Sequence, residues 1–168
     1  LSSIMYLSFI QTIGGFNDKE MQNLFLASYF KDIGMSLIPK ELFEKKELTD
    51  FEKKLFSEHA HSSQEILNQR VPLSDSYLNM IKNHHYLNDK ALWMIDKETQ
   101  QNTSELMTGI ESAMMSSLDI LVAMTHARPY RDAKSPFEAL DLLKTLLSDE
   151  YPQEFKALVV FLKKFYSS

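Results

Sequence analysis

Histidines and aspartates occupy positions where the helical pattern of this sequence predicts core residues. In the segment 50–69, the apolar stripe that begins with Phe51 and Leu55 continues at His59. Inward positions of other segments carry ionisable residues in the same way. They are His84 and His85 at the end of 75–85, Asp119 in 104–126, and Asp32 at the end of 18–33.

These groups need a common explanation, because a buried charge costs several kcal/mol unless it is paired or bound to a metal. We expect the five side chains to converge. Imidazole together with carboxylate is a donor set typical of zinc, iron, manganese or nickel sites. The alternative is a polar core network in which Asp32 and Asp119 pair with the buried histidines, and periodicity alone leaves both open.

The other candidates for chemistry have simpler interpretations. His61 lies two positions from His59 and therefore faces roughly the opposite side of a helix, which predicts a surface residue. His126 falls at the end of 104–126, where an imidazole can cap the helix. The nine methionines lie at core spacing and are interpreted as gap fillers. The sequence contains no phosphate-binding glycine loop and no nucleophile elbow.

The elements that must position these residues are all predicted to be helices. Apolar residues recur at intervals of three and four, and the sequence has only four glycines, so the fold class is all-α. Capping boxes mark three helix starts: Asn17 with Glu20, Thr49 with Glu52, and Ser135 with Glu138. The predicted helices span 2–13, 18–33, 50–69, 75–85, 104–126, 136–148 and 152–166, with a loop at 86–103 anchored by Trp93.

Composition limits the class of protein. The 168 residues suffice for one domain with one core, and no apolar run approaches the ~20 residues that span a bilayer, so no membrane insertion is expected. The net charge of -5 with scattered lysines argues against a nucleic-acid partner. The absence of cysteine fits a reducing compartment, and we expect a cytoplasmic protein. Because the chain begins at Leu1, we expect it to be the C-terminal part of a longer protein with an upstream domain.

Several motifs resemble those of a known family. Lys31-Asp32-Ile33-Gly34-Met35 resembles the His-Asp-Ile-Gly-Lys signature of the HD superfamily of metal-dependent phosphohydrolases. The order of later motifs is similar to that of HD-GYP domains, a branch associated with hydrolysis of cyclic di-GMP. His59 to Leu67 looks like the HPxxGxxIL helix, and Asn83 to Tyr86 looks like the HHE segment. The most specific match is Asp119 to Thr125 followed by Arg128-Pro129-Tyr130-Arg131, which is similar to DVYDALTxxRPYR.

The resemblance implies a fold and a metal site. It implies a single HD-superfamily helical bundle of about six to seven helices over residues 1–168. It makes Asp32 the metal-bridging aspartate, and the catalytic residue if the domain is active. It makes His59, His84 and His85 ligands of one metal, and Asp119 a ligand of its neighbour. These are the same five residues that periodicity places inward.

Departures from the family pattern fall within the same motifs. Lys31 replaces a histidine ligand, and a protonated lysine cannot ligate a metal. Met35 replaces the lysine that contacts phosphate in the family, and Tyr86 replaces the glutamate after the histidine pair. The Gly-Tyr-Pro loop is absent from 87–93. We therefore expect one metal site to be lost and substrate recognition to be altered.

One physical hypothesis follows from the lysine. Lys31 acts as a built-in cation between Asp32 and Asp119, while one transition metal (iron, manganese, zinc or nickel) is held by Asp32, His59, His84 and His85. In the alternative, Lys31 extends to the surface and no metal is bound.

The resulting functional prediction is a degenerate HD-GYP-like signalling module, in which hydrolysis of cyclic di-GMP is lost or weak. Its expected partner is a cyclic dinucleotide or a signalling protein. Two alternatives stay open. One is an active metal-dependent phosphodiesterase or phosphohydrolase acting on cyclic di-GMP or another phosphate ester. The other is a metal-free interaction module resembling HDOD domains.

Overall fold

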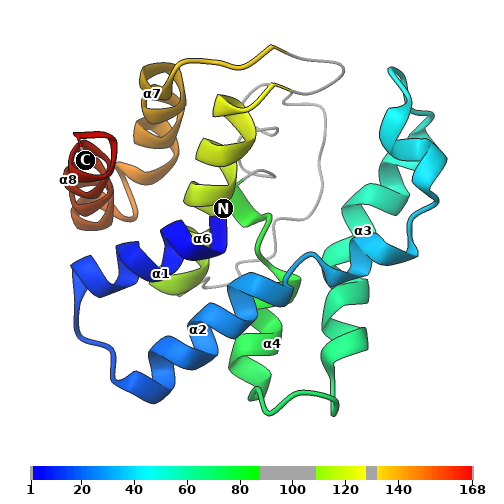
Figure 1. Cartoon of the computed structure of the whole chain (residues 1–168), viewed down its shortest axis with the longest axis horizontal. Coiled ribbons are helices and arrows are strands. Elements are labelled where there is room, and N and C mark those ends of the chain that lie inside the picture. The colour runs from blue at the N-terminus through cyan, green and yellow to red at the C-terminus, as the bar shows by residue number, and fades with distance from the viewer. Residues whose placement is uncertain (1, 88–108, 128–131, 168) are drawn as a thin grey trace.

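The computed structural model describes residues 2–87, 109–127 and 132–167, and within them all regular secondary structure is helical (Figure 1). The predicted all-α class is therefore confirmed. Seven α-helices and two 3-10 helices are described, in the order α1 (Ser2–Ile13), α2 (Asp18–Phe30), η1 (Ile33–Leu37), η2 (Lys40–Glu44), α3 (Asp50–Leu67), α4 (Asp75–Lys82), α6 (Ile110–Thr125), α7 (Pro136–Leu147) and α8 (Pro152–Ser167).

The three predicted capping boxes are confirmed. At the start of α3, Thr49 accepts a hydrogen bond from the Glu52 N–H while the Glu52 carboxylate accepts one from the Thr49 N–H. The same reciprocal pair opens α2 at Asn17 and α7 at Ser135. Each box satisfies two backbone donors that a helix start would otherwise leave unpaired. This is why these three starts could be located from the sequence.

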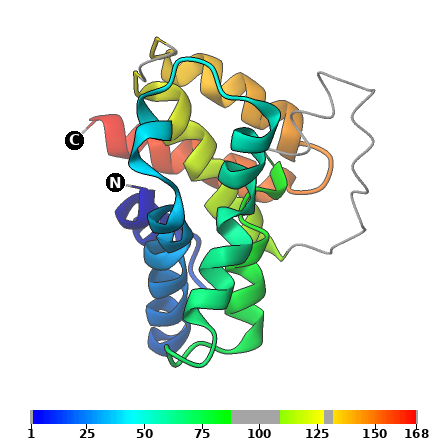
Figure 2. The same cartoon turned by 90° about the vertical axis from the view of Figure 1, so that its right-hand side faces the viewer.

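The helices form two packed groups (Figures 1 and 2). In one group, α1 packs against α6 and α8, and α7 packs against both α6 and α8. In the other group, α4 packs between α2 and α3, and η1 packs against α3. Contacts of α1 with α2 and of α4 with α6 join the groups. The segments that carry the predicted site residues meet along this junction.

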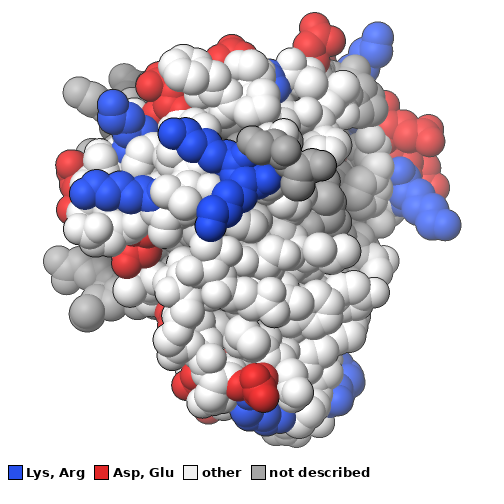
Figure 3. Space-filling view, turned by 60° about the vertical axis from the view of Figure 1, so that its left-hand side comes forward, with Lys and Arg blue, Asp and Glu red and all other residues white. Residues whose placement is uncertain are grey.

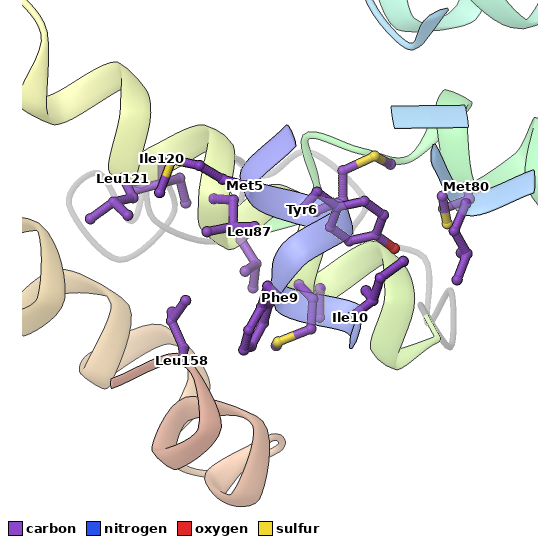
Figure 4. Packing of buried hydrophobic residues seen from close by; sticks show 14 of the residues in the cluster. Met5, Tyr6, Phe9, Ile10, Met80, Leu87, Ile120, Leu121 and Leu158 are labelled. Carbon is purple, nitrogen blue, oxygen red and sulfur yellow. The ribbon is translucent and has the colours of Figure 1, made fainter. Parts of the chain in front are cut away.

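The core is centred on α1 (Figure 4). Its buried residues Met5, Tyr6, Phe9 and Ile10 lie among core residues of α4, α6 and α8. Phe9 contacts Phe161 of α8, with ring centroids 5.3 Å apart. Met5, Met80, Met114 and Met115 are all buried in this cluster, which confirms for them the predicted role of gap fillers.

Two predicted helices end earlier than expected. The helix predicted over 18–33 stops at Phe30, and the one predicted over 75–85 stops at Lys82. Lys31, Asp32, His84 and His85 therefore lie in the turns that follow helices rather than on helical faces. The prediction failed because the apolar pattern continues through both turns. The start of the helix predicted over 104–126, most of the loop over 86–103 with Trp93, and Arg128 to Arg131 lie outside the described residues.

Phe51 is a further correction. It was predicted on the core stripe of 50–69, but it is 71% exposed. The stripe becomes buried only from His59 onward, because η1 contacts α3 at His59 and Ser63 rather than at its first turn.

The surface is mixed in charge. On the face shown in Figure 3, a group of Lys and Arg side chains borders a broad uncharged area, with acidic side chains around it. Among the described residues, no helix has the length and apolarity needed to cross a bilayer.

Gly34 determines how closely η1 approaches α3. Its N–H donates a hydrogen bond to the Ser63 Oγ at 2.8 Å. A Cβ at this position would lie 2.8 Å from the Ser63 nitrogen and still closer to the His59 carbonyl oxygen. Because these are largely backbone atoms, they cannot rotate away. Glycine is therefore required here for the packing that brings Asp32 to His59.

We predict that Gly34→Ala lowers the free energy of unfolding by about 2 to 3 kcal/mol, because the added methyl group must push η1 off α3. Urea unfolding followed by circular dichroism measures the change. Leu37→Ala is the matched control, since Leu37 lies in the same 3-10 helix but is 67% exposed. Equal stability of Gly34→Ala and the wild type would contradict the close packing.

Candidate metal centre

Four of the predicted residues gather around one carboxylate oxygen. The Asp32 Oδ1 lies 3.2 Å from the His59 Nε2 and 3.2 Å from the His84 Nε2. The His85 Nε2 lies 3.1 Å from the His59 Nε2. One ligand atom from each of the four residues falls within 4.8 Å of all the others. The group could hold a metal ion, and its members come from the turn before η1, from α3 and from the turn after α4.

Two of the imidazoles are oriented by backbone carbonyls. The His59 Nδ1 donates to the Phe56 carbonyl, and the His84 Nδ1 donates to the Ile81 carbonyl at 2.6 Å. In a neutral ring this tautomer leaves a lone pair on Nε2. A neutral ring would direct this lone pair at the Asp32 Oδ1, whereas a ring that also carries a proton on Nε2 would donate a hydrogen bond to the same oxygen. Orientation of a histidine through its second nitrogen is typical of metal ligands.

The backbone of His84 is also held from α6. The Ser116 hydroxyl donates a hydrogen bond to the His84 carbonyl, and Ser116 is fully buried. Sequence analysis missed this contact. The available signal was a serine placed directly after Met115 on the apolar side of the helix, where a buried hydroxyl needs a partner.

The cluster is closed on its histidine side and open at its carboxylate. His84 is 0% exposed and His59 is 7% exposed, whereas the Asp32 side chain is 50% exposed. Asp32 was predicted to face inward, so its exposure is a correction. Asp32 lies in a surface turn because α2 has already ended. Burial, together with the neighbouring His84 and His59, lowers the pKa of His85 to about 3, so its ring is neutral at physiological pH.

Lys31 lies on the other side of Asp32. Its Nζ contacts the Asp32 Oδ2 and lies 2.9 Å from the Asp119 Oδ2 of α6. Lys31 is only 4% exposed, so the alternative in which it extends to the surface is wrong. Burial alone would lower its pKa, but the carboxylates of Asp119 and Asp32 outweigh that effect and hold the pKa above its ordinary value. The side chain is a charged ammonium between two carboxylates.

The two carboxylate oxygens of Asp32 therefore contact different groups. Oδ1 faces the histidines and Oδ2 faces Lys31. Burial acts to raise the pKa of Asp32, but the contacts with His59, His84 and Lys31 hold the pKa well below its usual range. Burial raises the pKa of Asp119 against the pull of Lys31. Asp119 lies against the Lys31 ammonium and outside the four-residue group, and its role as a ligand of a second metal stays a prediction from the resemblance.

The remaining predicted positions are less central. Met35 is partly exposed in η1, and Tyr86 packs against the core. His61 is confirmed as a surface residue, 3.4 Å from Glu65 across one helical turn. His126 is confirmed at the end of α6, where its Nδ1 donates to the Val122 carbonyl at 2.9 Å. The motif Arg128-Pro129-Tyr130-Arg131 lies outside the described residues.

Comparison with known proteins gives one match. A family model described as an HD domain matches residues 6–151, which is most of the chain. No curated protein and no solved structure matches. The matched range includes all four residues of the histidine-aspartate cluster, together with Lys31 and Asp119.

We predict that Lys31→Met, measured in the presence of a chelator, lowers the free energy of unfolding by about 3 kcal/mol, because it leaves Asp119 buried without a cation. Denaturant unfolding measures the loss. The matched control is Lys53→Met, which removes an exposed ion pair with Asp50 and should cost less than about 1 kcal/mol.

Adding Asp119→Asn to Lys31→Met removes the orphaned charge and should recover part of the loss. If Lys31→Met costs no more than the surface control, the ammonium does not hold the two carboxylates together.

Proposed function

Because the chain belongs to the HD domain family, we propose that it is a degenerate, HD-GYP-like signalling module that binds one transition metal and has lost most or all hydrolysis of cyclic di-GMP. The observation that carries the proposal is the Lys31 ammonium between Asp32 and Asp119. A fixed positive charge stands where the family resemblance expects a histidine and a second metal.

The residues that would hold the single metal are Asp32, His59, His84 and His85. Their donor set fits iron, manganese, zinc or nickel. The orientation of His59 and His84 supports the fit, because each ring in its neutral form would present an acceptor nitrogen to the acceptor oxygen of Asp32 at 3.2 Å. Such pairs repel one another unless a cation lies between them. A bound metal ion would supply that positive charge and would polarise a phosphate oxygen or a water molecule.

In the alternative of a polar core network, the positive charge beside the Asp32 Oδ1 comes from protonated histidines rather than from a metal. This alternative requires His59 and His84 each to carry a proton on both ring nitrogens. Lys31 already brings a full positive charge to the other oxygen of Asp32. A second and third cation around one carboxylate would repel Lys31 and each other. The arrangement therefore favours a metal over an imidazolium pair.

Loss of hydrolysis follows from the same contacts. Hydrolysis by two metals needs one ion for the attacking oxygen and another for the leaving oxygen. The Lys31 Nζ contacts the Oδ2 atoms of Asp119 and Asp32, so these oxygens are not available to a second metal. The protonated amine has no lone pair with which to bind a metal itself. Met35 adds no charge to replace the family's phosphate-contacting lysine. Binding of a phosphate ester is compatible with this site, whereas efficient cleavage is not.

One observation favours a rival. The four-residue cluster is complete, and its carboxylate is half-exposed. An active phosphodiesterase or phosphohydrolase could use a single metal and Asp32 for another phosphate ester. The experiments below distinguish this rival from the degenerate module.

We predict that the metal-stripped protein binds one equivalent of Mn²⁺ or Zn²⁺ per chain. Isothermal titration calorimetry, with elemental analysis after gel filtration, measures the stoichiometry. His84→Ala should abolish binding because it removes a buried ligand. His61→Ala is the matched control and should bind as the wild type does, since His61 is exposed and lies outside the cluster.

Lys31→His restores the family's ligand type and should raise the stoichiometry toward two. Two equivalents bound by the unmodified chain would contradict the built-in cation. Equal metal binding by His84→Ala and the wild type would contradict the site itself.

We predict that the metal-loaded protein forms no more linear product from cyclic di-GMP than His84→Ala does, as measured by liquid chromatography. The physical reason is the missing second metal. Lys31→His combined with Met35→Lys restores both altered groups and is expected to raise turnover above the wild-type background. Turnover by the unmodified chain that His84→Ala abolishes would overturn the proposal in favour of the active rival.

A further inference from the structure

A cavity of about 530 Å³ lies between α2, α4 and the start of α6. It is separate from the histidine-aspartate cluster, because none of the four cluster residues lines it. Its volume is within the range that small organic ligands occupy in proteins. The side chains that define its chemistry are Phe16, Glu20, Tyr77, Lys82, Glu111 and Ser112.

The charged groups of the cavity are unbalanced. Two carboxylates, from Glu20 and Glu111, face one ammonium, from Lys82. One Glu20 oxygen accepts the Asn17 N–H at 2.8 Å in the capping box, which leaves its other oxygen available. The Glu111 carboxylate forms no ion pair or hydrogen bond with any other residue that the structure describes. The cavity therefore has negative charge in excess.

Ser112 adds a hydroxyl group to the lining of the cavity. It is 6% exposed and lines the cavity from α6. Within the described part of the chain, no residue forms a hydrogen bond with its hydroxyl. The Ser112 Oγ is not among the fully buried polar atoms that lack a partner, so this oxygen is accessible from the cavity. An ammonium could donate to this oxygen.

Two aromatic side chains also line the cavity. Phe16 precedes α2, and Tyr77 belongs to α4. Aromatic rings attract cations through their negative faces, and they also pack against apolar ligand groups. An unpaired carboxylate, an unpartnered hydroxyl and two rings in one cavity are together suited to an organic amine with an apolar body.

We propose that this cavity is a binding site for a small organic cation, with its ammonium held by Glu111 and Ser112 and its apolar part against Phe16 and Tyr77. The site is independent of the metal centre, so it stands whether or not the proposed function is correct. It would give the module a second ligand of a chemical class opposite in charge to a cyclic dinucleotide.

The test uses three probes of similar shape and different charge: 2-phenylethylammonium, neutral 2-phenylethanol and anionic 3-phenylpropanoate. Each is titrated into the metal-free, ¹⁵N-labelled chain and followed by chemical-shift changes. The proposal predicts saturable shifts for the ammonium probe, centred on residues that line the cavity, and much weaker binding of the other two. Equal affinity for the ammonium and the alcohol would overturn it, and so would the absence of saturable shifts at the cavity.

Two substitutions locate the ammonium. Glu111→Gln keeps the shape of the side chain but removes its charge, and should weaken binding of 2-phenylethylammonium about tenfold. Ser112→Ala removes only a hydroxyl group and gives a second measurement if Glu111→Gln does not fold. The matched control is Glu44→Gln, the same change of charge at an exposed position in η2, which should leave the affinity unchanged. Wild-type affinity in Ser112→Ala or in folded Glu111→Gln would overturn the assignment.

Discussion

The arrangement of the candidate site depends on one buried ammonium. Lys31 contacts the carboxylates of Asp32 and Asp119, and so it joins the end of α2, the start of η1 and the middle of α6. An isolated ammonium or carboxylate in this position would be strongly unfavourable, and each is tolerated because the other is present. This ion triad also fixes the direction of the Asp32 carboxylate, which leaves Oδ1 for the histidines.

The histidine side of the site is held by neutral contacts instead. Carbonyl groups orient His59 and His84 through their Nδ1 atoms, and the Ser116 hydroxyl holds the His84 backbone. Gly34 allows η1 to lie against α3, which sets the distance between Asp32 and His59. Asp32 is therefore positioned in two ways: by ion pairing with Lys31 on one side, and by hydrogen bonding and close packing of the histidine segments on the other. In our account, this division explains how one metal site can persist after the other has been replaced by a lysine.

Much of this could be predicted from the sequence, and the exceptions have identifiable causes. Capping boxes are local signals, so three helix starts were located correctly. The inward position of His59 followed from the period of α3. The turns after α2 and α4 were missed because apolar residues continue through them, and Asp32 was therefore not expected to be half-exposed. The contact of Ser116 with His84 and the cavity between α2, α4 and α6 depend on tertiary packing, which no local pattern encodes.

The central claim is that a lysine ammonium takes the place of one metal while a single metal binds beside it. Anomalous diffraction from crystals of the chain grown with Mn²⁺ or Zn²⁺ tests it most directly, because the method locates each ion and also shows Lys31. The account predicts one anomalous peak, about 2.1 Å from the nitrogens of His59 and His84, with the Lys31 Nζ still between Asp32 and Asp119. A second peak beside Asp119, with Lys31 displaced, would contradict the account.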